Sequence, residues 1–138
     1  MTARRAALPA LLLAAALTTA APAEHAVAYR YTVLGYVADA DGRARAAVRV
    51  ELSRAKTGFS YLGETGADGF YVLVARLGDE SAGETLSLRA GSEARVVTAR
   101  FDPADHATEG GTRVDFTARR PLETPTLFAG TLKRFLAQ

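Results

Sequence analysis

The residues of this sequence that are best suited to acid–base or metal chemistry gather in one segment. Asp102, Asp105, His106 and Glu109 all lie within residues 102–109. Carboxylates beside an imidazole can bind a metal ion weakly or transfer protons. A solvated acidic loop has the same composition, so a weak metal-binding or enzymatic role for residues 102–109 is the least favoured of our hypotheses.

Other polar residues lack the partners that such chemistry needs. Asp39-Ala40-Asp41-Gly42 resembles the start of a calcium loop, but the twelfth position counted from Asp39 is Val50, where that loop needs a bidentate glutamate. A turn is the favoured interpretation here and at Asp68. The chain has no cysteine and only two histidines, which argues against a thiolate zinc site, a cysteine nucleophile or a multi-histidine centre. No serine stands in a Gly-x-Ser-x-Gly motif. We therefore expect no catalytic residue, metal or cofactor.

The charge balance argues against a nucleic-acid partner. The formal net charge is +2, and Arg4 and Arg5 supply two of the positive charges at the extreme N-terminus. The remaining chain is neutral overall, whereas nucleic-acid binding needs a basic surplus on the folded part.

Residues 1–23 have the pattern of a cleaved signal peptide. Arg4 and Arg5 form a short positive region, residues 6–17 form an apolar run, and small residues follow up to Ala23. A membrane span needs about 20 apolar residues, so the run is too short for one. We predict cleavage after Ala23 and export by the general secretory route to the periplasm or the medium.

From residue 27 onward, apolar residues recur with a period of two, the pattern of half-buried strands. Seven short strands are expected, and turns rich in Gly and Asp separate most of them. In the strand at 70–75 we expect Phe70 to face the core and Tyr71 to face outward. The pattern predicts an all-β fold, a seven-stranded antiparallel β-sandwich. The expected strands lie near residues 29–37, 48–53, 59–61, 70–75, 86–90, 96–101 and 114–116.

Two motifs in this body resemble a known family. Residues 33–42, VLGYVADADG, followed by AVRV at 47–50, are similar to the opening of carboxypeptidase regulatory-like domains, and TGADGFY at 65–71 is similar to their second signature. The stretch LSLRAG at 86–91 resembles a later strand and turn of the same family. The resemblance implies a transthyretin-like sandwich and a non-catalytic module of exported proteins. The sequence departs from the family pattern at residues 43–46, where the family often has Pro and Gly.

Aromatic residues are numerous for a domain of this size. A row of them on an exposed sheet face would stack against sugar rings or a partner surface. Tyr61 and Tyr71 are the candidate residues for binding a polysaccharide or peptidoglycan.

The character of the sequence changes after residue 120. Pro121 and Pro125 indicate a short linker. From Thr126 onward the spacing of apolar residues predicts a short amphipathic helix. Three alternatives remain open for its apolar stripe: docking on its own domain, binding a partner protein, or peripheral contact with a membrane. The stripe consists of Leu127, Phe128, Leu132, Phe135 and Leu136.

These observations divide the chain into a signal peptide at 1–23, a β-sandwich at 24–120, and a linker with an amphipathic tail at 121–138. The leading hypothesis is a small exported module without catalytic activity that binds another protein of the cell envelope, with the tail as the candidate contact. The main alternative is a carbohydrate-binding sandwich that uses exposed aromatic side chains.

Overall fold

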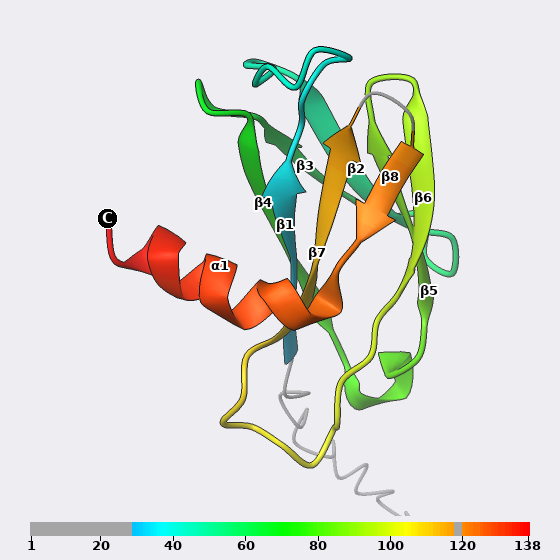
Figure 1. Ribbon diagram of the computed structural model, residues 1–138. Coiled ribbons are helices and arrows are strands. Elements are labelled where there is room, and N and C mark those ends of the chain that lie inside the picture. The colour runs from blue at the N-terminus through cyan, green and yellow to red at the C-terminus, as the bar shows by residue number, and fades with distance from the viewer. Residues whose placement is uncertain (1–28, 118–119) are drawn as a thin grey trace, which may run out of the picture.

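The computed structural model describes residues 29–117 and 120–138 (Figure 1), and the predicted signal peptide at 1–23 lies outside the described residues. The described chain forms eight strands, two short 3-10 turns and one helix. In chain order these are β1 (Tyr29–Tyr36), β2 (Arg49–Arg54), β3 (Ser60–Glu64), β4 (Phe70–Leu77), η1 (Asp79–Ser81), β5 (Thr85–Ala90), β6 (Glu93–Thr98), β7 (Gly110–Thr117), β8 (Arg120–Glu123), η2 (Pro125–Leu127) and α1 (Phe128–Leu136).

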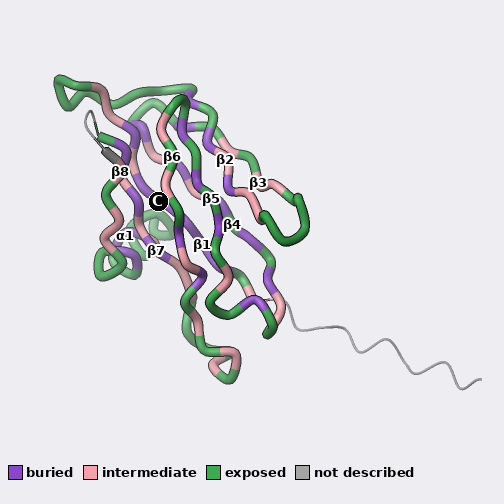
Figure 2. Tube along the Cα trace, turned by 90° about the vertical axis from the view of Figure 1, so that its right-hand side faces the viewer, coloured by how far each residue is buried: buried purple, intermediate pink, exposed green. Residues whose placement is uncertain are grey.

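The strands form two four-stranded sheets that enclose one hydrophobic core. The first sheet has the order β4-β1-β7-β8 and the second the order β3-β2-β5-β6. Val33 and Val114 of the first sheet and Leu52 and Leu88 of the second are fully shielded from solvent. Burial of such apolar side chains is the main driving force for folding. In Figure 2 the buried segments follow the strands, while the loops at both ends are exposed. The prediction of an all-β fold with a short C-terminal helix is confirmed at this level.

The first sheet differs from the expected antiparallel arrangement in two respects. β1 pairs with β7 in parallel, with Val33 opposite Thr112. An eighth strand, β8, pairs with the end of β7 and contains Pro121, which faces Phe116. The expected boundary after residue 120 therefore falls inside a strand, and the expected linker at Pro121 is wrong. Proline is tolerated there because β8 lies at the edge of its sheet.

The two faces of β4 are opposite to the prediction. Tyr71 is buried in the core, and Phe70 lies on the outer face of the sheet. The Tyr71 side chain reaches past Gly35 on β1, and its hydroxyl donates a hydrogen bond to the carbonyl oxygen of Val114 on β7 at 2.6 Å. Gly35 is needed at this crossing because a Cβ there would lie 1.8 Å from the same carbonyl oxygen.

Tyr61 closes one edge of the structure. It lies on β3, and its ring packs against the core from a half-buried position. Its hydroxyl donates to the carbonyl oxygen of Arg76 on β4 and accepts from the amide of the same residue, both at 3.2 Å. The tyrosine thus forms hydrogen bonds with backbone groups that an edge strand otherwise leaves unpaired.

The C-terminal helix docks on its own domain. α1 lies across the outer face of the β4-β1-β7-β8 sheet (Figure 1). Among the described residues, no helix is long and apolar enough to cross a membrane.

Candidate functional site

The loop between β6 and β7 carries the acidic residues that the sequence singled out, and the structure uses them in turns. Asp102 accepts a hydrogen bond from the amide of Ala104 at 2.9 Å. Asp105 accepts from the amides of Ala107 and Thr108, each at 3.0 Å. Hydrogen bonds from Thr108 and these amides lower the pKa of Asp105, so its carboxylate is the form that stabilises the turn.

His106 and Glu109 of the same loop contact residues at the start of β1. Glu109 forms an exposed ion pair with Arg30 at 3.0 Å. The ring of Tyr29 stacks on Phe101 and on His106, with centroid separations of 5.2 and 5.1 Å. A cleft of about 440 Å³ lies between the loop and the start of β1. Within residues 29–117 and 120–138, no three His, Asp or Glu side chains come together in a group that could hold a metal ion.

A second cleft lies on the outer face of the first sheet, where α1 crosses it. Three contacts along α1 fix the helix. Phe128 is buried over Gly111 of β7, where an added Cβ would lie 2.5 Å from its ring. Thr131 is buried, and the ring of Phe135 packs on that of Phe70 of β4, with the ring centres 5.2 Å apart.

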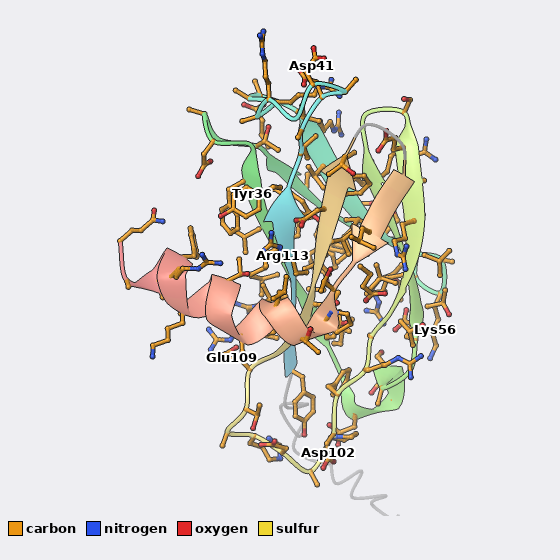
Figure 3. The ribbon with its side chains drawn as sticks, in the orientation of Figure 1. Tyr36, Asp41, Lys56, Asp102, Glu109 and Arg113 are labelled. Carbon is orange, nitrogen blue, oxygen red and sulfur yellow. The ribbon has the colours of Figure 1, made fainter. Side chains whose placement is uncertain are left out.

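Arg113 connects the helix to the sheet beneath it. Its guanidinium donates to Thr131 of α1 at 3.1 Å and forms a two-point ion pair with Asp115 at 3.0–3.1 Å. It also lies over the ring of Tyr36, 5.1 Å from the ring centre. Asp115 accepts a further hydrogen bond from the amide of Tyr36 at 3.0 Å. Tyr36 and Arg113 therefore form a fixed platform on the sheet beside α1 (Figure 3), since paired and hydrogen-bonded charges have little freedom.

The cleft occupies about 410 Å³ between this platform, the β3–β4 connection and the end of α1. Aromatic rings form part of its lining. The ring centres of Tyr36 and Phe70 are 5.2 Å apart, and the ring of Phe135 packs on that of Phe70. Polar side chains complete the lining: Glu64 and Asp68 from the β3–β4 side, and Arg134 and Gln138 from the C-terminal end.

The structure separates the residues that the sequence selected for binding. Of the predicted glycan-binding pair, Tyr71 is 1% exposed and cannot stack on a ligand, and Tyr61 is used at the sheet edge. This arrangement contradicts the expected outward position of Tyr71. Phe70, its neighbour, takes the outer position instead.

The predicted apolar stripe of the tail is also divided. Phe128 is buried against the sheet, Leu132 is half-buried, and Phe135 packs on Phe70. Leu127 and Leu136 remain exposed, at 47% and 69%. Docking on its own domain, one of the three alternatives for the tail, accounts for the inner part of this stripe.

Tyr36 and Phe70 line the cleft and Arg113 supports Tyr36, but none of the three was predicted from the sequence to be a binding residue. The available signal was weak: Phe70 and Val72 make the second face of β4 as apolar as the first. A strand that is apolar on both faces indicates that something covers both of them.

Neither the protein-family models nor the curated proteins include a match to this chain. Among solved structures, the chain is similar to the dioxygenase domain of a dioxygenase–carbohydrate-binding protein fusion from the cellulolytic bacterium Streptomyces sp. SirexAA-E. The TM-score is 0.46 and the sequence identity is 18%, over 70% of this chain and 84% of that chain.

Proposed function

We propose that this protein is an exported binding module without catalytic activity, and that it binds its ligand on the face of the first sheet that carries α1. One observation carries the proposal: a cleft of about 410 Å³ lies beside α1 and is lined by both aromatic and charged side chains. Concave sites of this size, with apolar walls and a few polar groups, are the usual form of ligand-binding sites.

Kinship with carboxypeptidase regulatory-like domains is part of the proposal. The positions of the two motifs support it, because they meet at one end of the structure. The amide of Val37, in the first motif, donates to the carbonyl oxygen of Gly69 in the second at 2.9 Å. Gly69 has φ +77°, and a Cβ there would lie 2.5 Å from the carbonyl oxygen of Val37. Gly69 of the second motif therefore permits the close contact with Val37 of the first motif.

A site-specific photo-crosslinking experiment in cells tests the binding face. A benzoylphenylalanine in place of Gln138, at the rim of the cleft, is expected to capture an envelope component. The matched control is the same residue in place of Ser87, which is exposed on the second sheet. Equal capture from both positions, or capture from Ser87 alone, would contradict the proposed face.

Export is tested by the N-terminus of the protein recovered from the periplasm or the medium. The expected first residues are Glu24-His25-Ala26, which follow cleavage after Ala23. A cytoplasmic protein that retains residues 1–23 would contradict the export proposal.

A protein of the cell envelope is one candidate for this ligand, and one observation favours it. Leu127 and Leu136 stay exposed after α1 docks, and exposed apolar residues on a fixed helix suit a protein contact. Replacing both with Ser is expected to abolish capture of a protein partner from position 138. Unchanged capture would exclude these two residues as the contact.

A further inference from the structure

The cleft beside α1 has charged groups of opposite sign in its lining. Glu64 and Asp68 come from the β3–β4 side, and Arg134 comes from α1. Within residues 29–117 and 120–138, neither Glu64 nor Arg134 takes part in an ion pair or a side-chain hydrogen bond. One oxygen of Asp68 accepts from the amide of Phe70 at 3.1 Å. The cleft therefore offers both free acceptors and a free donor group.

This arrangement discriminates between classes of ligand. A cation attracted by Glu64 and Asp68 would also meet Arg134, and an anion attracted by Arg134 would meet the two carboxylates. Placing like charges together in an interface is strongly unfavourable. A purely apolar ligand would remove these charged groups from water without replacing their hydrogen bonds, which is also unfavourable.

A neutral polyhydroxylated ligand satisfies both sides. A hydroxyl group both donates and accepts hydrogen bonds. It can therefore donate to Glu64 and accept from Arg134 or from the side-chain amide of Gln138. The aromatic part of the lining suits the apolar face of a sugar ring, because the ring hydrogens meet the electron-rich face of an aromatic side chain. Phe135 is 37% exposed and presents such a surface.

We propose that the cleft between α1 and the β3–β4 connection binds a neutral saccharide, with a pyranose ring against Phe135 and its hydroxyls between Glu64 and Arg134. This inference rests on the proposed binding face and names its ligand class. It also moves the carbohydrate site from Tyr61 and Tyr71, which pack within the domain, to residues on α1 and at the end of β3.

Titration of the mature protein with oligosaccharides of different charge tests the inference. The probes are cellohexaose and chitohexaose as neutral ligands, a glucosamine oligomer as a cation and a galacturonic acid oligomer as an anion. Amide signals of Gly66, Phe135 and Gln138 in NMR spectra are expected to shift with a neutral probe. Because the ligand carries no charge, its affinity is expected to change little between low and high salt.

Two variants and a control locate the site. Phe135→Ala removes the stacking surface, and Glu64→Ala removes an acceptor on the opposite side without touching α1. Each is expected to weaken binding of the neutral probe at least tenfold, while Lys133→Ala, at an exposed position of α1 outside the lining of the cleft, leaves it unchanged. Unchanged melting temperatures of Glu64→Ala and Lys133→Ala show that neither variant alters binding by unfolding.

The outcomes separate this inference from the proposed function. Preference for a charged oligomer, or neutral binding that survives both variants, would overturn the inference. No binding of any saccharide, together with crosslinking from position 138 but not from Ser87, would overturn the inference and leave the proposed binding face standing. Saccharide binding whose NMR shifts map to the second sheet would overturn both.

Discussion

At the scale of single residues, two tyrosine hydroxyls bind backbone carbonyl groups, one within the first sheet and one between the two sheets. Tyr71 donates to Val114 across Gly35, and Tyr31 donates to the carbonyl oxygen of Thr98 on β6 at 3.1 Å. Burial raises the pKa of Tyr31 to about 12 and that of Tyr71 further still. The neutral phenol is the form that the folded protein retains, because a buried phenolate would lose its hydration.

This shift predicts a loss of stability in alkaline solution. An unfolded tyrosine ionises near pH 10, whereas folded Tyr31 ionises near pH 12. The stabilisation is therefore fully present below pH 10, and it is lost as the pH rises from 10 to 12. Urea unfolding of the wild type is expected to show a free energy that falls across this range, and Tyr31→Phe is expected to show a shallower fall. Parallel curves for the two proteins would contradict the assignment.

Ala47 is a second residue with a direct prediction. It has φ +56°, a left-handed conformation that costs an L-residue about 1–2 kcal/mol. Its amide is held by the carbonyl oxygen of Thr65 at 2.9 Å, so the turn retains this conformation. Ala47→Gly is expected to raise the free energy of unfolding by about 0.5 kcal/mol, after the added entropy of the unfolded glycine is subtracted. Ala46→Gly is the control and is expected to give no gain; a gain at both positions would point to a general effect of glycine in this loop.

At the scale of elements, Phe128 in the first turn is the largest buried side chain of α1. Phe128 is 5% exposed, and its ring lies on Gly111, so removal of the ring leaves an unfilled site on the sheet. Phe128→Ala is expected to lower the free energy of unfolding by about 3 kcal/mol. Leu136→Ala, at the exposed end of the same helix, is expected to stay within about 0.5 kcal/mol of the wild type. Similar values for both variants would mean that the helix does not pack as described.

The same helix explains how far the sequence alone could predict this fold. Alternation predicted a strand at 70–75 but not which face is inside, because α1 covers Phe70 while the core covers Tyr71. The periodicity of apolar residues therefore predicted the strand and the helix. It could not predict which face of the strand is inside, because that depends on the contact between the strand and the helix. β8 was missed for a similar reason: Pro121 suggests a linker unless its place at a sheet edge is known.

The candidate site was less accessible to prediction than the fold. Its aromatic members Tyr36, Phe70 and Phe135 come from three elements that are far apart in the sequence. Tyr36 and Phe70 meet because they face each other in the β1–β4 register. Phe135 joins them only through the path of α1 across the sheet, which no local pattern encodes.

At the scale of the whole molecule, side chains bridge both open sides between the two sheets. On one side Tyr61 of β3 binds the backbone of Arg76 on β4. On the other side Arg95 of β6 donates to the carbonyl oxygen of Pro121 on β8 at 3.0 Å and lies 3.7 Å from Glu123. Such coverage protects edge strands from pairing with other chains.

Hydrogen exchange tests this protection. Tyr61→Phe removes the hydroxyl that binds Arg76 and keeps the ring, so the amide of Arg76 is expected to exchange markedly faster than in the wild type. The amide of Val74, which lies in the same strand, serves as the reference and is expected to keep its rate. Equal acceleration at both amides would indicate loosening of β4 as a whole.

The parallel pairing of β1 with β7 has a consequence for the order of events during synthesis. β1 is the first strand of the described chain to leave the ribosome, and its neighbour at Gly110–Thr117 follows only after five further strands have appeared. Until then one side of β1 can pair with β4, but its other side stays open. Contacts between residues so far apart in the chain form slowly. Completion of the first sheet must therefore wait until residues 110–117 have emerged, long after β1 itself has been synthesised.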